Sequence, residues 1–262
     1  DLKSLLIGSE GSLGLVTAAS LRLAPLPRSE STALLFVNSP KDALAVLNIA
    51  QDFFAEGISA FELLSGQGFS FIQEKMPDVS FPFIKIPDWA ILIHLGFGSN
   101  RNAENSMIEL YEKICGMKLA YDGVLAKSQK ESDALWGLRE TIPEANRKVG
   151  AIASHDISLP LSAIPTFIDR AHFQLSSVGK FRINCFGHLG DGNLHYNIFG
   201  NGSLPDGFKG KSTELTNKLY EIVHKYNGSF SAEHGIGQLK KNNLKTHKND
   251  VAYSLMKIIK SQ

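Results

Sequence analysis

The sequence predicts an α+β fold in which helices cover an antiparallel sheet. Short apolar runs typical of strands alternate along the chain with segments whose apolar residues recur at helical spacing. No glycine-rich loop lies between an expected strand and the helix after it, which argues against a Rossmann-type dinucleotide-binding domain. An antiparallel sheet with helices on one face fits these observations best.

The expected elements follow one another along the chain. Strands are expected over residues 16–23, 33–37, 61–64, 90–95, 151–159, 182–186 and 194–199. Helices are expected over residues 41–55, 102–114, 127–147, 160–175, 212–226 and 251–260. Ser39 and Pro40 supply an N-cap and a first-turn proline for the first helix, and Gly116 and Gly228 end two later ones.

Composition excludes several classes of protein. The chain has 262 residues, 43% of them hydrophobic and 20% charged, which is ordinary for a globular protein. A formal net charge of +1 gives no electrostatic case for a nucleic-acid partner. The apolar runs are too short to cross a membrane, and no signal peptide is visible. Two cysteines form no disulfide framework, so we expect a reducing compartment, the cytoplasm or a mitochondrial matrix.

The ends of the sequence lead us to expect a piece of a longer protein. The chain begins at Asp1 without a methionine, and its expected last helix stops at the C-terminus. Two prolines followed by serines, within residues 24–31, indicate a linker. We therefore divide the chain into a short segment, residues 1–27, and a larger domain, residues 28–262.

Two histidines flank an expected hairpin turn at Asp191-Gly192. A two-residue turn there would place His188 opposite His195, with Asn197 on the same face. Two imidazoles so placed can bind one metal ion, since histidine nitrogens bind zinc at about 2.0–2.1 Å. The simpler alternative is that Asp191-Gly192 is only a turn and that the histidines are packing residues.

A third metal ligand is expected in the stretch that begins Glu233-His234-Gly235. Both Glu233 and His234 can face one site only if the backbone bends, which Gly235 permits. Two histidines and one glutamate leave a coordination position open, as in catalytic rather than structural zinc sites. The alternative is that this stretch is a solvated loop.

Several motifs resemble one known family. Residues 187–195 and 233–237 resemble the paired signatures of the FAD-linked oxidase C-terminal domain family, which includes D-2-hydroxyglutarate dehydrogenase, D-lactate dehydrogenase and the flavin subunit of glycolate oxidase. Residues 7–14 resemble the end of the FAD-binding domain of the same proteins, and residues 135–140 resemble a further family stretch. The resemblance implies a ferredoxin-like cap domain preceded by the tail of an FAD-binding domain.

The resemblance also implies roles for single residues. The histidine pair and Glu233 match ligands of zinc or another divalent metal, and His234 matches the base that takes the hydroxyl proton. Arg139 matches an arginine that binds the substrate carboxylate, and Asn197 matches a polar substrate contact. The residues expected to touch FAD are Gly8, Ser9, Glu10, Gly11 and Gly14.

One position departs from the family pattern. Members often carry a lysine shortly before the aspartate of the strand that here reads Ser154-His155-Asp156, and Ser154 takes its place. Without that cation we expect the pocket to prefer monocarboxylates, unless His155 or Lys148 compensates.

The expected activity is that of an FAD-dependent dehydrogenase. The resemblance implies oxidation of a small D-2-hydroxy acid to the 2-oxo acid, with a metal assisting hydroxyl deprotonation and FAD taking the hydride. The electron acceptor stays open, and a homodimer is compatible with the sequence. The alternatives are an FAD-dependent oxidase of another alcohol and a non-catalytic metal-binding module. We expect this chain alone to be inactive, because it carries only a small part of a flavin site.

Overall fold

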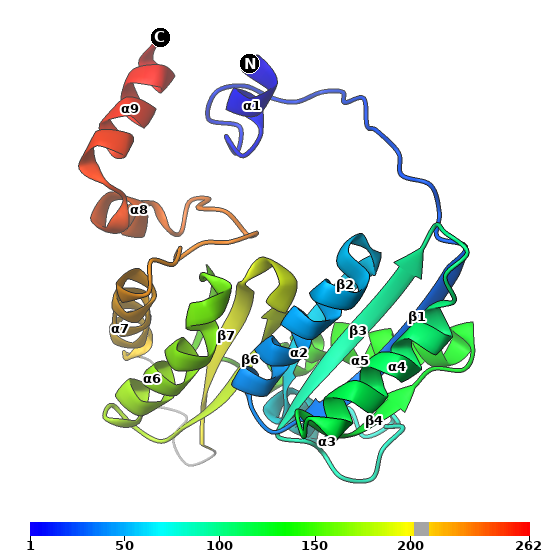
Figure 1. The fold of residues 1–262 in the computed structure, drawn as a ribbon. Coiled ribbons are helices and arrows are strands. Elements are labelled where there is room, and N and C mark those ends of the chain that lie inside the picture. Colours follow the sequence, from blue (N-terminus) through cyan, green and yellow to red (C-terminus); the bar gives the residue numbers. More distant parts are fainter. Residues whose placement is uncertain (202–209) are drawn as a thin grey trace.

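One seven-stranded antiparallel sheet forms the centre of the fold (Figure 1). The structure is a computed structural model that describes residues 1–201 and 210–262. The strands lie in the order β4-β1-β3-β2-β6-β7-β5. Their bounds are β1 Ser29–Val37, β2 Ile58–Ser65, β3 Trp89–Phe97, β4 Ala120–Leu125, β5 Ala153–Ser158, β6 Phe181–His188 and β7 Asn193–Gly200. The α+β class and the antiparallel sheet expected from the sequence are therefore confirmed.

The sheet consists of two units with related topology. In the first unit, β1-α2-β2 and β3-α4-β4 give the strand order β4-β1-β3-β2, which is the ferredoxin-like arrangement. In the second unit, β5-α6-β6 and β7-α7 repeat it as β5-β7-β6. An isolated bridge between Ser158 and Ser229 lies at the outer edge of β5, where a fourth strand would pair. The helices of the two units are α2 Pro40–Phe54, α4 Ala103–Gly116, α6 Ile164–Ser176 and α7 Ser212–Lys225.

Helices cover both faces of the sheet, whereas one covered face was expected. The four helices of the two units pack on one face, and α3 and α5 pack on the other. Each face of the sheet thus has its own hydrophobic core. In β1, Ala33, Leu35 and Val37 belong to the core under the four helices, while Leu34 and Phe36 belong to the core under α3 and α5. A strand buried on both faces is a continuous apolar run instead of an alternating one. The bounds of the second pair are α3 Gly66–Lys75 and α5 Gln129–Val149.

Helix α5 forms one wall of the site described below. It begins with a reciprocal cap. The Ser128 hydroxyl accepts a hydrogen bond from the Glu131 backbone N–H (3.3 Å), and the Glu131 carboxylate accepts one from the Lys127 backbone N–H (2.7 Å). Leu138 and Ile142 are buried against the sheet. A neighbouring stripe of the same helix therefore faces the pocket.

The two ends of the chain lie away from the sheet (Figure 1). The strand expected over residues 16–23 does not form, and Leu21 and Leu23 are exposed, because no described strand lies beside this segment. Among the described residues, no helix is both long and apolar enough to cross a membrane. The remaining elements are α1 Leu2–Leu6, α8 Lys241–His247, α9 Asp250–Ser261 and the short 3-10 helices η1 Ala55–Gly57, η2 Leu161–Ala163 and η3 Leu189–Asp191.

Candidate metal and substrate site

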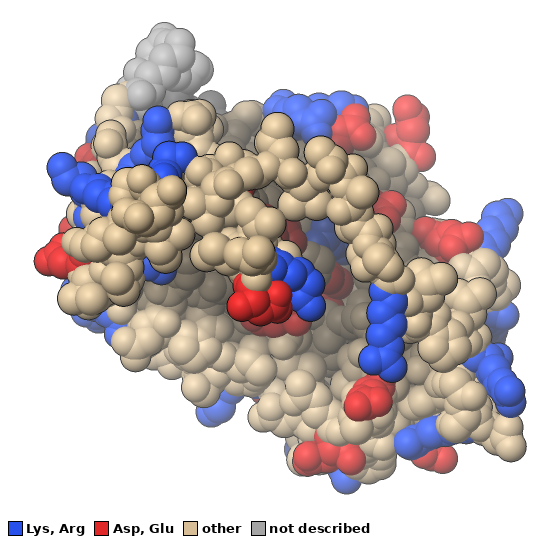
Figure 2. All heavy atoms as spheres, turned by 90° about the horizontal axis from the view of Figure 1, so that it is seen from above, with Lys and Arg blue, Asp and Glu red and all other residues tan. Residues whose placement is uncertain are grey.

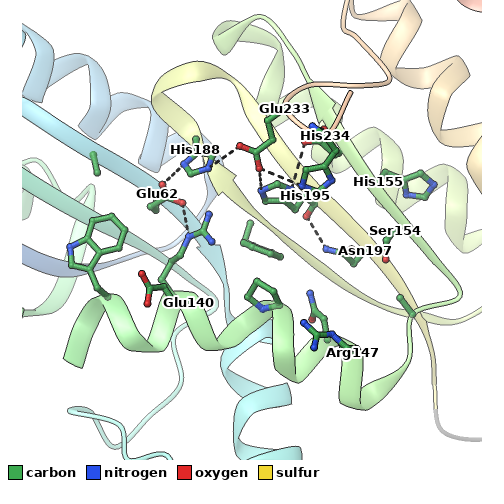
Figure 3. Close-up of a pocket in the computed structure, with 18 of the residues that line it drawn as sticks. Glu62, Glu140, Arg147, Ser154, His155, His188, His195, Asn197, Glu233 and His234 are labelled. Carbon is green, nitrogen blue, oxygen red and sulfur yellow. Dashed lines mark hydrogen bonds and ion pairs between the residues drawn. The ribbon is translucent and has the colours of Figure 1, made fainter. Parts of the chain in front are cut away.

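A pocket of about 920 Å³ lies between α5 and the strands of the second unit (Figure 3). Seen from above, the molecule is hollowed, with basic and acidic side chains close together at the edge of the hollow (Figure 2). The pocket-lining residues that bear on function are Glu62, Arg139, Arg147, Ser154, Asp156, His188, His195, Asn197, Glu233 and His234. The residues that the sequence analysis expected to bind the metal, accept the proton and contact the substrate therefore all line one pocket.

The β6–β7 hairpin places both histidines on one face, but not in the predicted register. His195 pairs with Phe186 instead of His188, and Asn197 pairs with Asn184. The register differs by two residues, so each side chain stays on its original face. The ring centroids of the two histidines lie 6.1 Å apart.

The turn explains the different register. Residues Leu189–Asp191 form a 3-10 turn that ends at Gly192, whose φ is 72°. Leu189 is fully buried, so the turn folds back onto the core instead of ending in a two-residue hairpin loop. A Cβ at Gly192 would also lie 2.2 Å from the Leu159 carbonyl oxygen, so no other residue fits there without a backbone shift.

His188, His195 and Glu233 converge in a geometry that suits a metal ion. One Glu233 carboxylate oxygen lies 3.2 Å from Nε2 of His195, and the other lies 3.6 Å from Nε2 of His188. Atoms bound tetrahedrally at about 2.1 Å from one zinc ion are roughly 3.4 Å apart. The types of donor atom and their two distances to Glu233 therefore suit zinc or a similar divalent ion, but His188 is not among the residues whose ligand atoms all lie within 4.8 Å of one another.

His234 lies beside this cluster on its open side. Its ring stacks on His195, with centroids 5.4 Å apart and planes at 23°, and its Nε2 is 3.6 Å from Glu233. Its side chain is 63% exposed, against 11% for His195. Gly235, with a φ of 71°, supplies the bend that lets Glu233 and His234 line one pocket.

Asp156 holds the loop that carries Glu233 and His234. Its Oδ2 accepts hydrogen bonds from the backbone N–H groups of Ala232 (3.0 Å) and His234 (2.8 Å), and its Oδ1 accepts one from the Asn193 amide (2.8 Å). Burial raises the pKa of Asp156, but these hydrogen bonds outweigh it and lower the pKa below its usual value.

Asp156 also belongs to an alternative set of ligand atoms. In this set, one ligand atom from each of four residues lies within 4.8 Å of the other three. The four residues are Asp156, His195, Glu233 and His234. We favour His188 over Asp156 as a ligand. The Asp156 carboxylate is already engaged by three hydrogen bonds, whereas Nε2 of His188 faces Glu233.

Burial keeps His195 in the form that a metal requires. It lowers the pKa of the imidazole, against the opposing effect of the Glu233 and Asp156 carboxylates. The ring is therefore neutral at pH 7, and only a neutral imidazole has a free nitrogen lone pair for a metal ion.

The buried carboxylate of Glu62 connects His188, an expected metal ligand, to Arg139, the expected substrate anchor. One oxygen contacts Nδ1 of His188 at 2.5 Å, and the other accepts a hydrogen bond from Nε of Arg139 at 3.0 Å. A carboxylate on one ring nitrogen fixes the orientation of the other, which here faces Glu233. The Arg139 guanidinium has five N–H donors, so it can also bind a carboxylate.

Neither proposed substitute for the absent lysine places a cation in the pocket. His155 points toward the opposite core, with its ring nitrogens bonded to the Tyr196 carbonyl (2.9 Å) and the Thr216 hydroxyl (3.0 Å). Burial lowers the pKa of His155 to about 4, so it is uncharged at neutral pH. Lys148 pairs with Glu144 at 3.1 Å and does not line the pocket.

The segment expected to touch FAD lies largely exposed, and its role stays a prediction. Glu10 forms its main contact with the site, accepting hydrogen bonds from the backbone N–H groups of Ile236 (2.7 Å) and Gly237 (2.6 Å). These bonds lower the pKa of the Glu10 carboxyl. The segment is thereby connected to the loop that carries the expected base.

Sequence reasoning assigned no role to Glu62, Asp156 or Arg147, although all three line the pocket. Glu62 and Asp156 each carried a usable signal, because each is a carboxylate within a run that was expected to be a strand. Arg147 follows Arg139 by two helical turns, so helical spacing would have placed it on the same side of α5.

Comparison with curated proteins finds similar sequences in plants, animals and bacteria. The mitochondrial D-2-hydroxyglutarate dehydrogenase of Arabidopsis thaliana is 32% identical over 268 residues, covering 99% of this chain and 45% of that protein. The D-2-hydroxyglutarate dehydrogenase of Stutzerimonas stutzeri (strain A1501) is 32% identical, covering 100% and 56%. The chain thus spans about half the length of the curated relatives it matches.

Solved structures support the fold. p-Cresol methylhydroxylase with substrate bound matches with a TM-score of 0.60 at 11% identity, covering 89% of this chain and 50% of that one. An alkyldihydroxyacetonephosphate synthase matches with a TM-score of 0.54 at 15% identity, covering 95% and 48%. Residues 26–262 match the family described as FAD linked oxidases, C-terminal domain. The chain therefore belongs to the C-terminal domain family of the FAD-linked oxidases.

Proposed function

We propose that this chain is the substrate- and metal-binding part of an FAD-dependent dehydrogenase that oxidises a small D-2-hydroxy acid to the 2-oxo acid. Family membership and the names of the relatives support the flavin chemistry. The observation that carries the proposal is that the three proposed metal ligands and the Arg139 guanidinium line one pocket. A 2-hydroxy acid can use both, because its hydroxyl suits a metal and its carboxylate suits a guanidinium.

The chemistry is divided among separate residues. His188, His195 and Glu233 would hold the zinc or other divalent ion, which when bound supplies Lewis acidity at the substrate hydroxyl. His234 accepts the hydroxyl proton, since an imidazole is a general base suited to neutral pH. Its greater exposure and its place beside the cluster support a role as base rather than ligand.

The substrate is held at two further points. Arg139 binds the carboxylate, and Glu62 restricts the Arg139 side chain to one orientation. Asn197 is buried in the pocket wall next to His195, where its amide can contact the substrate.

The flavin side of the reaction lies mainly outside this domain. We assign residues 1–27 to the tail of an FAD-binding domain, with FAD contacts from residues 8–14, and residues 28–262 to the cap domain. The start of β1 at Ser29 and the family match from residue 26 support this boundary. The segment 8–14 supplies at most one wall of a flavin pocket, so the chain alone should bind no FAD tightly and be inactive. Relatives named as mitochondrial support the matrix as one location.

Flavin bleaching tests the proposal in the flavoprotein that contains this chain. Under anaerobic conditions, D-lactate, glycolate or D-2-hydroxyglutarate should bleach the absorbance of oxidised FAD. Arg139→Gln should weaken substrate binding by roughly 2–5 kcal/mol, while Lys148→Gln, outside the pocket, should have no effect. Metal binding without bleaching by any hydroxy acid would contradict a dehydrogenase and leave a metal-binding module.

A further inference from the structure

A second arginine faces the same pocket from further along α5. Arg139 and Arg147 are eight residues apart on one helix, so they lie on one side of it with a spacing of about 12 Å along its axis. Both line the pocket. Figure 3 shows Arg147 on the helix side, across from Ser154 and Asn197 on the sheet.

The last turns of α5 are fixed over this part of the sheet. The side-chain amide of Asn184 donates to Oδ1 of Asn146 at 2.8 Å, and both residues are buried. Asn184 lies in one row with Asn197 and Ser154, across β6, β7 and β5. Arg147 follows Asn146 directly, so its backbone is held beside this row of neutral side chains.

Arg147 is available to bind an anion. No ion pair found among the described residues uses its guanidinium, whereas the neighbouring Lys148 is paired with Glu144. The other residues of the row across from it, Ser154 and Asn197, carry no charge. Of the carboxylates that line the pocket, Glu62 contacts Arg139 and His188, and Glu233 contacts the two histidines, so neither is paired with Arg147.

We infer that Arg147 binds a second anionic group of the substrate, so that the pocket selects 2-hydroxy acids with a terminal carboxylate. The inference rests on the proposed function, in which Arg139 holds the carboxylate next to the reacting carbon. The substrate chain then extends along α5, past Asn197, toward Arg147. This differs from the preference for monocarboxylates expected from Ser154, because the cation comes from the helix and not from β5.

A matched pair of substrates tests the inference in the holoenzyme. D-2-Hydroxyglutarate and D-2-hydroxyvalerate share one carbon chain and differ by a terminal carboxylate or methyl group. The wild type should prefer hydroxyglutarate in kcat/KM. Arg147→Gln should lower kcat/KM for hydroxyglutarate by roughly 10- to 100-fold and leave hydroxyvalerate unchanged, as expected for the loss of a charged hydrogen bond. Arg147→Lys should retain part of the preference.

Lys148→Gln is the control, because it removes an adjacent cation that does not line the pocket. It should leave both substrates unchanged. The inference is wrong if Arg147→Gln affects both acids equally, if Lys148→Gln has the same effect, or if the wild type prefers hydroxyvalerate.

Binding of the product acids separates this inference from the proposed function. Calorimetry with zinc-loaded holoprotein should show tighter binding of 2-oxoglutarate than of 2-oxovalerate, and Arg147→Gln should abolish the difference. Binding that depends on Arg147 without flavin reduction by any hydroxy acid would overturn the proposed function and leave the anion site standing. Flavin reduction with 2-oxoglutarate binding that does not depend on Arg147 would do the reverse.

Discussion

The two units of the sheet share a topology but present different side chains to α5. In the first unit, β3 turns Ala90, Leu92 and His94 toward this helix, and the first two are buried in the core that α3 and α5 cover. In the second unit, β7 turns His195 and Asn197 into a pocket. One arrangement of strands thus produces a packed core where helices cover the row of side chains and a pocket where they leave it open.

His94 in the first unit and His188 in the second show how the surroundings of a histidine differ between the two units. His94 has a carboxylate partner, Glu30 at 3.2 Å, much as His188 has Glu62. The other ring nitrogen of His94 bonds to the Thr32 hydroxyl, whereas that of His188 faces Glu233. A carboxylate beside one ring nitrogen is therefore not enough to indicate a metal ligand. The group beside the other ring nitrogen distinguishes the two histidines.

The largest expected effect is loss of the metal from the second unit. His188→Ala combined with His195→Ala should abolish stoichiometric zinc binding. Because the Lewis acid is then absent, the activation free energy should rise by several kcal/mol, which lowers turnover roughly 10³-fold or more. Elemental analysis of protein purified without chelator and then supplied with zinc measures the first effect. His94→Ala is the matched control and should keep one metal per chain. Full zinc binding in the double variant would contradict the site.

A smaller loss of activity, without loss of metal, should follow from His234→Ala. The variant keeps the cluster but lacks the proton acceptor, so kcat should fall by roughly 10²–10⁴. Glu233→Ala should lose metal instead, because it removes a ligand. The opposite pattern, with metal lost from His234→Ala and kept by Glu233→Ala, would exchange the two roles.

Much of the fold was predictable because its strands and helices carry strong local signals. Helix α2 follows the Ser39-Pro40 cap as expected, and β3 is an apolar run as expected. Helix α3 was not predicted, because Gly66 and Gly68 are poor helix formers. Gly68 allows close packing, since a Cβ there would lie 3.2 Å from the Asn184 side chain and would require that side chain to shift by a few tenths of an ångström. Tertiary contact overrides propensity at this point.

The residues of the site were easier to predict than the contacts between them. Motif spacing indicated His188, His195 and Glu233, and the structure brings them together. The hairpin register was wrong, since burial of Leu189 cannot be read from the turn sequence. Glu62 lies 126 residues from His188 in the sequence, so no local pattern could pair the two.

Glu62→Gln tests that long-range connection. Glutamine keeps the shape but removes the charge that orients His188, so zinc affinity should fall by about 10- to 100-fold, as for other residues that position metal ligands. Competition with a zinc-binding dye gives the dissociation constant without any assay of activity. Glu30→Gln, the equivalent change at His94, should leave zinc affinity unchanged. An unaltered affinity in Glu62→Gln would show that His188 needs no such support.

The smallest expected effect concerns the stability of the second unit below neutral pH. His155 is buried on the face of β5 opposite the pocket, and burial lowers its pKa to about 4. The unfolded chain takes up a proton near pH 6.5 and the folded chain does not, so the free energy of unfolding is highest above pH 6.5 and falls as the pH drops toward 4. Between pH 6.5 and 5.5 this single group should cost about 1 kcal/mol.

Urea unfolding of wild type and His155→Gln at both pH values measures this cost. Glutamine can still donate a hydrogen bond to the Tyr196 carbonyl but does not titrate, so the variant should lose about 1 kcal/mol less than the wild type over this range. A chelator in both samples removes any contribution from metal release. Equal pH dependence in the two proteins would mean that His155 is protonated in the folded state, and therefore that the core of the second unit is more open to water than its burial indicates.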